Sequence, residues 1–273
     1  MKSTPLFILI FAFFGTGLMA QNPDSLNIYF LENSPFSYAD GKKAKGIEAD
    51  ILEEYVNWLK TKKNISPTIT YKSFKEFDSF YAAVKNGSSK VMGMGSVTNN
   101  SSREKEIAFS APYLRNVALL ITGGSVPTIK NKNREDIAKS LGSLSAITVN
   151  ASSHSVYLNE IKKQFLPQLK ITFETSPVKV LESISANNKL FGYADIITYW
   201  SYLKNNNGSY LKIQKCLSET KEYFSFIMPK NCAHAELINE FFESGFGFTS
   251  TKTYHQILEK YLGYEIIGSV EID

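Results

Sequence analysis

The chain has 273 residues, of which 43% are hydrophobic and 21% charged, with a formal net charge of +4 at pH 7. This length can bury one large core or two smaller ones. The lysines are spread along the sequence, so the charge pattern excludes a concentrated nucleic-acid-binding surface. After residue 20 no stretch is apolar enough to span a bilayer. The part of the chain that follows residue 20 is therefore predicted to be soluble.

The first 20 residues have the pattern of a secretory signal peptide. Lys2 supplies a positive charge, residues 5–14 form a short apolar core, and small residues precede Ala20. Cleavage after Ala20 would leave Gln21 as the first mature residue. No cysteine lies near that point, so a lipoprotein is not expected. The segment predicts export to the periplasm.

The first half of the mature chain is predicted to alternate between strands and helices. Ile51 and Leu52 begin an apolar pattern at helical spacing, and Glu48 and Asp50 at that helix start are expected to be ordinary partners of the helix dipole. Such alternation indicates parallel strands covered by helices. The expected elements are strands 26–31, 68–74 and 91–96 and helices 46–60, 76–86 and 101–109.

The pattern restarts after a polar, turn-rich segment at residues 122–136. The repetition predicts a second lobe similar to the first, and two amphipathic helices end the chain. The elements expected here are strands 145–150, 170–174 and 190–198 and helices 153–166, 177–188, 235–246 and 253–264.

Polar turns follow two of the predicted strands, at residues 93–103 and 150–155. Ligands of open α/β sheets bind beyond the carboxyl ends of the strands, and helix N-termini favour anions. Arg103 closes the first turn, and its planar guanidinium can pair with a carboxylate through two nitrogens. The sequence therefore predicts an anion-binding cleft between two lobes.

Four segments resemble family 3 periplasmic solute-binding proteins, which bind polar amino acids for ABC importers and share a fold with ionotropic glutamate receptor ligand domains. They are ENSPFSYADGKKAKGIEADILEEY (32–55), SVTNNSSREKEIAFSAPYL (96–114), NASSHSVYL (150–158) and GYADII (192–197). The second is the most specific, because a hydroxyl residue precedes an arginine by five positions. The resemblance covers nearly all of the mature chain.

This resemblance implies an α/β, two-lobe periplasmic binding protein (type II, Venus-flytrap) with two hinge crossings. Lobe 1 is expected over residues 21–115 and 225–273, and lobe 2 over 116–224. The implied function is capture of a small carboxylate-bearing, amino-acid-like solute by a monomer that docks on the permease of an ABC importer. No enzyme activity, cofactor or metal is expected.

The resemblance also implies the ligand-binding residues. Arg103 would hold a ligand carboxylate, and lobe 1 would add polar groups and an aromatic wall, whereas lobe 2 would close with hydroxyl groups. The further residues implied are Ser96, Thr98, Phe36, Ser152 and Ser153.

Two positions depart from the family pattern. Relatives that hold an α-ammonium carry an aspartate five residues after the position of Asp195, where this chain has Trp200 preceded by Tyr199. These aromatic residues are candidates for a cation–π contact, and a register slip that brings Asp195 itself into the site is the alternative. Ala151 stands at a position where relatives often have glycine. Alanine disfavours a positive φ in that turn.

Simpler roles stay open for the same residues. Judged from its spacing alone, Arg103 is also compatible with a position on the protein surface. The aromatic residues Phe36, Tyr199 and Trp200 are also compatible with packing in the core. Asn100 is interpreted mainly as a helix N-cap, and Ser152 and Ser153 are cap candidates that are also compatible with ligand contact.

The two cysteines, Cys216 and Cys232, leave a disulfide possible in an exported protein. The three histidines share no metal-ligand spacing. The same fold is also compatible with two other functions: a ligand-sensing or regulatory module, and a dehydratase-like enzyme. Ser152 and Ser153 beside His154 do not form a nucleophile motif such as G-x-S-x-G.

Overall fold

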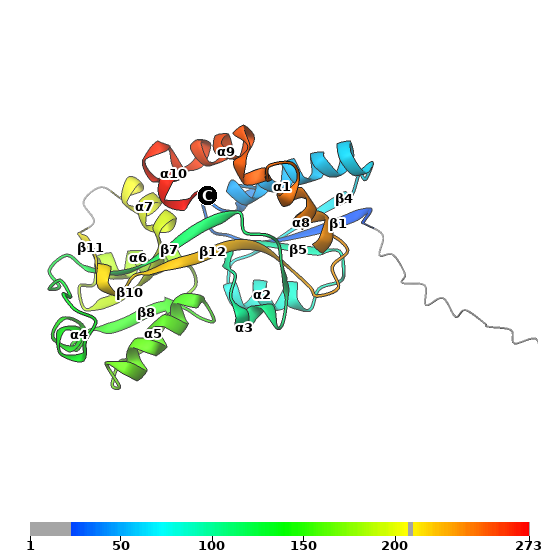
Figure 1. Ribbon diagram of the computed structural model, residues 1–273. Helices are drawn as coiled ribbons and strands as arrows, with labels where there is room; N and C mark the ends of the chain where they lie inside the picture. The colour runs from blue at the N-terminus through cyan, green and yellow to red at the C-terminus, as the bar shows by residue number, and fades with distance from the viewer. Residues whose placement is uncertain (1–22, 207–209, 273) are drawn as a thin grey trace, which may run out of the picture.

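Two long strands, β7 (Leu114–Gly123) and β12 (Glu219–Met228), connect the two lobes of the protein (Figure 1). The computed structural model describes residues 23–206 and 210–272, so the predicted signal peptide lies outside the described residues. No helix within these ranges has the length and apolar character needed to cross a bilayer. The predicted two-lobe α/β architecture is confirmed.

The strands form one continuous sheet that runs through both lobes. Its order is β4-β1-β5-β12-β7-β10-β8-β9, with β11 added beside β7 and β6 beside β12. Pairing is parallel within each outer part and antiparallel at β12 and β7. The remaining strands are β1 (Ser25–Leu31), β4 (Thr68–Phe74), β5 (Val91–Thr98), β6 (Ala108–Phe109), β8 (Ser145–Val149), β9 (Ile171–Glu174), β10 (Leu190–Asp195) and β11 (Leu211–Ile213), and the separate hairpin β2 (Tyr38–Asp40) and β3 (Lys43–Lys45).

Helices cover the faces of the sheet in each lobe, because their apolar stripes need a partner. Lobe 1 contains α1 (Ile47–Trp58), η1 (Leu59–Lys63), α2 (Phe77–Lys85), α3 (Ser101–Glu104), α8 (Ala235–Glu243), η3 (Phe248–Ser250), α9 (Lys252–Leu262) and α10 (Tyr264–Val270). Lobe 2 contains α4 (Arg134–Leu141), α5 (Ser153–Gln164), α6 (Pro177–Ala186), α7 (Ile196–Asn205) and η2 (Lys215–Leu217).

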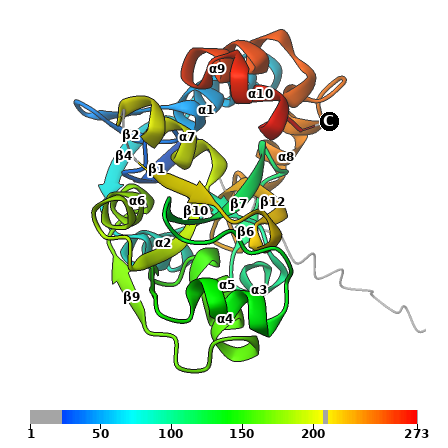
Figure 2. The same cartoon turned by 90° about the vertical axis from the view of Figure 1, so that its left-hand side faces the viewer.

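The last helices return to lobe 1 after the chain has passed through β12. In Figures 1 and 2, α9 and α10 lie on the same side of the molecule as α1, far from α4 in lobe 2. Leu258 and Leu262 of α9 are fully buried in the same core as Ile51. The chain therefore crosses between the lobes twice, through β7 and β12, while the lobe boundaries near residues 115 and 225 stay a prediction.

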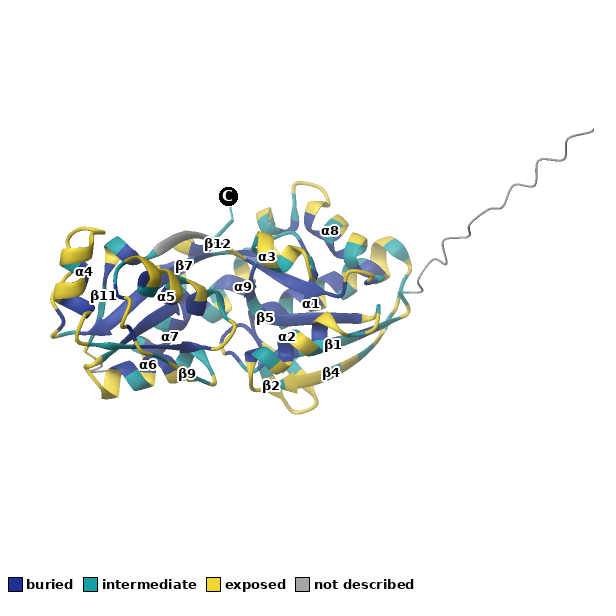
Figure 3. Cartoon of the chain, turned by 90° about the horizontal axis from the view of Figure 1, so that it is seen from below, coloured by how far each residue is buried: buried dark blue, intermediate teal, exposed yellow. Residues whose placement is uncertain are grey.

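The buried strands carry the core of both lobes (Figure 3). One hydrophobic cluster fills lobe 1 and another fills lobe 2. A third cluster contains residues of both, among them Phe80 and Val97 from lobe 1 and Val149 and Leu181 from lobe 2. Apolar packing between the lobes indicates a closed arrangement.

Two predicted elements differ in the structure. The expected strand 190–198 ends at Asp195, and α7 begins at Ile196, because the segment 196–205 packs a helical apolar stripe that buries Ile197 and Tyr202. The expected helix 101–109 is reduced to the single turn α3 before β6. Ile107 is fully buried and β6 pairs with β12, so strand pairing replaces the remaining turns.

Candidate functional site

A cavity lies between the lobes, at the carboxyl end of β5 and the N-terminus of α5. Its volume is about 50 Å³, enough for a few water-sized groups at roughly 10–15 Å³ each. Polar residues predicted for the site line it on both sides, alongside Leu31, Phe77 and Val149 as apolar walls. The predicted residues that line the cavity are Ser96, Thr98, Arg103, Ser152 and Ser153.

Arg103 connects the two lobes across this cavity. One terminal nitrogen, Nη1, donates to the carbonyl oxygen of Thr98 at 3.1 Å and to Ser153 Oγ at 3.4 Å. The other, Nη2, donates to the carbonyl oxygen of Ala151 at 3.0 Å. Within the described chain these bonds use three of the five N–H donors that a guanidinium has. Two donors, one on Nε and one on Nη2, have no acceptor among the described residues.

Two aromatic rings lie beside this guanidinium. Its central carbon lies 5.1 Å from the ring centroid of Phe77 and 5.6 Å from that of Tyr81. Burial lowers the pKa of Arg103, and the neighbouring Tyr81 and Glu222 act in the opposite direction. Because an arginine keeps its proton in proteins, the side chain brings a permanent positive charge into the gap.

The lobe 1 side of the cavity is held by a carboxylate that the sequence interpretation treated as a helix-dipole partner. Glu48 is fully buried. Its Oε1 accepts bonds from the backbone N–H groups of Gly95 at 3.0 Å and Ser96 at 3.2 Å, and from the Tyr113 hydroxyl at 2.7 Å. Ser96 has a φ of 47°, and its Oγ accepts from Asn33 Nδ2 at 2.9 Å. Glu48 therefore positions the turn that carries Ser96.

The lobe 2 side is built at the start of α5. Ser152 is its N-cap and accepts a bond from Ser155 N–H at 3.2 Å, which confirms the predicted cap. Ala151 has a φ of 53°, so the turn adopts the left-handed conformation despite the methyl group. That conformation aims the Ala151 carbonyl at Arg103. Ligand contact by Ser152 and Ser153 stays a prediction.

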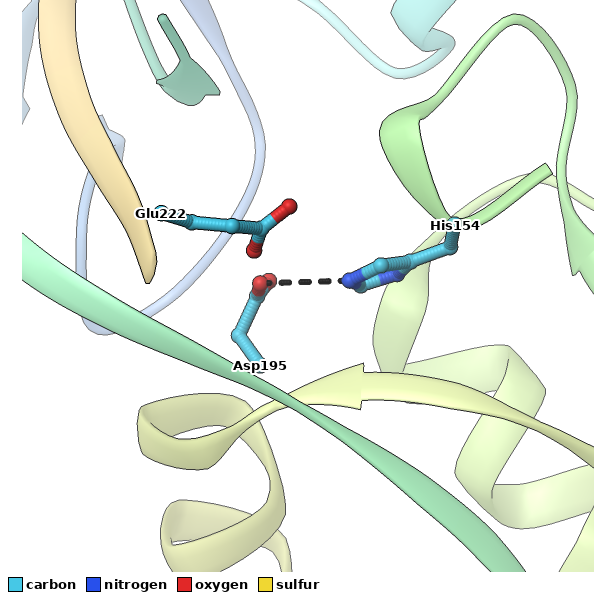
Figure 4. Close-up of side chains that lie close together, drawn as sticks. All are labelled: His154, Asp195 and Glu222. Carbon is cyan, nitrogen blue, oxygen red and sulfur yellow. Dashed lines mark ion pairs between the residues drawn. The ribbon is translucent and has the colours of Figure 1, made fainter. Parts of the chain in front are cut away.

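Behind these serines lies a buried cluster of His154, Asp195 and Glu222 (Figure 4). His154 Nε2 lies 3.4 Å from Asp195 Oδ1. Asn116 Nδ2 donates to Asp195 Oδ1 at 2.7 Å and to Glu222 Oε2 at 2.5 Å. The Tyr157 hydroxyl also donates to Glu222. His154 and Asp195 line the cavity, so the cluster is continuous with the site.

The charges in this cluster are coupled. Burial opposes protonation of His154, but the Asp195 carboxylate outweighs it and raises the pKa of the imidazole. Burial also raises the pKa of Glu222, with His154 acting against the rise and Asp195 adding to it. The sequence interpretation missed the cluster because its members come from α5, β10 and β12, and no spacing along the chain connects them.

Three predicted ligand residues lie elsewhere. Phe36 does not line the cavity: it is fully buried in lobe 1, edge-on to Phe224 with ring centroids 5.4 Å apart. Tyr199 and Trp200 also lie outside the cavity. Both residues lie on α7, which begins at Ile196, and their rings pack against the hydrophobic clusters. Asp195 occupies the lining instead, which is the register-slip alternative.

The possible disulfide is not formed. Cys216 and Cys232 are both free thiols. Cys232 lies in the core of lobe 1, whereas Cys216 packs against the core of lobe 2. The fold keeps the two residues in different lobes, so the disulfide that the sequence left possible is absent.

Comparison with known protein families finds one matching family model. The model of the bacterial extracellular solute-binding proteins, family 3, matches residues 27–264. None of the curated proteins matches the sequence.

Solved structures share the fold at low sequence identity. An ancestral arginine-binding protein bound to arginine has 18% identity and a TM-score of 0.70, covering 89% of this chain and 100% of its own. The arginine-, lysine-, histidine-binding protein ArtJ from Geobacillus stearothermophilus has 19% identity and a TM-score of 0.67, with 90% and 99% covered. The GluR0 ligand-binding core from Nostoc punctiforme in complex with L-glutamate has 14% identity and a TM-score of 0.67, with 88% and 100% covered.

Proposed function

We propose, since the chain belongs to the bacterial extracellular solute-binding proteins of family 3, that it captures a small carboxylate-bearing, amino-acid-like solute between its lobes. The structural relatives include proteins whose bound ligands are arginine and L-glutamate. Transfer of the solute to the permease of an ABC-type importer, by a monomeric protein exported to the periplasm, belongs to the same proposal. The protein would bind its solute without chemical conversion.

The observation that carries this proposal is the place of Arg103 in the interlobe cavity. Its guanidinium faces the gap, rests against aromatic rings and keeps free donors within the described chain. A carboxylate is the group that matches a planar pair of N–H donors. Each charge-assisted bond of this kind contributes about 1.5–3 kcal/mol.

The binding mechanism follows from the two-lobe architecture. The cavity lining comes from β5 and α3 on one side and from α5, α6 and Asp195 on the other. A solute touches both sides only when the lobes are closed. Its greater affinity for the closed form would therefore shift the population toward that form, and a permease would recognise the closed lobes.

The first test is a thermal-shift screen of amino acids, dicarboxylates and related acids, followed by calorimetry with the solute that raises the Tm most. Arg103→Ala is expected to weaken binding at least about 100-fold, because two charge-assisted bonds are lost. Arg103→Lys is expected to recover only part of the loss, since an ammonium cannot pair through two nitrogens.

Arg134→Ala is the matched control, because this exposed arginine begins α4 and does not line the cavity. It should keep the wild-type affinity. Equal affinity in wild type and Arg103→Ala would contradict the assignment.

A further inference from the structure

The cluster of His154, Asp195 and Glu222 has the composition of a metal site. It offers one imidazole nitrogen and two carboxylate oxygens, and these donor atoms all lie within 4.8 Å of one another. The three residues are at most 7% exposed. Buried carboxylates at this distance repel each other unless a cation or a proton lies between them.

The charge of the cluster suits a divalent cation. Asp195 and Glu222 can carry two negative charges, and His154 alone can supply one positive charge. A divalent cation would balance both carboxylates while a neutral imidazole donates its lone pair. Arg103 would then remain available for the carboxylate of a solute.

The geometry also fits a small transition-metal ion. Four ligands at 2.0–2.2 Å from zinc in a tetrahedron are separated by about 3.4 Å. His154 Nε2 and Asp195 Oδ1 are 3.4 Å apart. In Figure 4 a ring nitrogen of His154 points toward the Asp195 carboxylate, and the Glu222 carboxylate lies beside Asp195.

Neighbouring donors would hold the ligands in place. The Asn116 amide bonds both carboxylates, and the Tyr157 hydroxyl bonds Glu222. Such outer partners orient ligands and tune metal affinity. His154 and Asp195 line the cavity, which leaves a coordination position that opens toward the solute.

We propose that His154, Asp195 and Glu222 bind a divalent transition-metal ion of the zinc type, with an open position facing the interlobe cavity. The nitrogen ligand disfavours Mg²⁺ and Ca²⁺, which select oxygen ligands. A solute held by Arg103 would place a second oxygen or nitrogen atom at this open position.

The experiment is calorimetric titration of the chelator-treated full chain with Zn²⁺. We expect one ion per chain, and at least a 10-fold loss of affinity in both His154→Gln and Glu222→Gln. His255→Gln is the matched control: His255 also faces a carboxylate, Glu271, at 2.8 Å, but is about 43% exposed in its side chain and has no second carboxylate in its ion pair. This variant should keep the wild-type affinity.

A second measurement uses the wild-type protein and therefore does not depend on the folding of any variant. Co²⁺ added to the chelator-treated protein should give the visible absorption of a tetrahedral site, and Zn²⁺ should displace it. Circular dichroism checks that the variants fold, and Asp195→Asn replaces any variant that does not. Absence of Zn²⁺ uptake, or equal uptake in wild type and in folded cluster variants, would overturn the proposal.

Solute binding separates this proposal from the function proposed above. Arg103→Ala should lose the solute but keep Zn²⁺. If the wild-type protein takes up Zn²⁺ but binds no solute of the screen, the solute-binding function fails and the metal proposal stands. If an amino acid binds the chelator-treated protein at full strength and the protein takes up no Zn²⁺, the cluster serves the solute without a metal and the metal proposal fails.

Discussion

At the residue scale, Glu48 shows how a buried carboxyl group can support a candidate site without lining its cavity. Its carboxylate receives two backbone N–H groups from the end of β5 and the Tyr113 hydroxyl. Burial is the main cause that raises the pKa of Glu48 to about 7, and the hydrogen bonds reduce the rise. The turn that carries Ser96 therefore depends on a group that titrates near neutrality.

Glu48 makes stability depend on pH. Its folded pKa lies above the unfolded value, so its contribution is fully present below pH 4.5 and is lost as the pH rises through about 7. The loss amounts to about 3 kcal/mol. Glu48→Gln should flatten the pH dependence of the unfolding free energy, which urea titrations at pH 5 and pH 8 measure.

Glu53→Gln serves as the comparison, because Glu53 lies on the same helix but is exposed. It should keep the wild-type slope. If Glu48→Gln retains the full pH dependence, a different group carries it.

At the element scale, the N-terminus of helix α5 is capped by a residue that also lines the interlobe cavity. Ser152 caps the helix and lines the cavity. Asn133 caps α4 by accepting a bond from Asp136 N–H at 2.8 Å, but lies outside the cavity. Comparing the two caps can therefore separate helix stabilisation from the proposed solute contact.

Removal of either cap should destabilise the protein, but only removal of the Ser152 cap should weaken solute binding. Ser152→Ala and Asn133→Ala are each expected to lower the unfolding free energy by about 1 kcal/mol. We expect weaker solute binding in Ser152→Ala alone, measured by calorimetry beside urea unfolding. If Ser152→Ala binds the solute with unchanged affinity, Ser152 caps the helix but does not contact the solute.

At the scale of the whole molecule, closure is stabilised by contacts between the lobes. Asn150 of the lobe 2 turn donates through Nδ2 to Asp78 on α2, and Arg103 bonds the Ala151 carbonyl nearby. These polar bonds lie beside the apolar cluster shared by both lobes. Contacts of this kind exist only when the gap is closed, so they bias the equilibrium between open and closed lobes toward the closed form.

Asn150→Ala should shift that equilibrium toward the open form. We expect affinity for the solute found in the screen to fall about 3- to 10-fold, because one polar bond of the closed form is lost. Asn205→Ala removes a comparable bond within one lobe, from Nδ2 to the Ser201 carbonyl at 3.0 Å, and should leave affinity unchanged. Equal affinities in the two variants would show that Asn150 does not contribute to closure.

The sequence by itself determined the order of elements, the two-lobe fold and the polar turns, because apolar periodicity and helix caps are local signals. It also singled out Arg103 and its hydroxyl neighbours, whose spacing lies within one segment. The tertiary structure alone decided that Glu48 supports Ser96, that Phe36 is buried away from the cavity, and that His154 meets Asp195 and Glu222. These contacts join residues far apart in the chain, and sheet order and helix register bring them together through packing that no local pattern encodes.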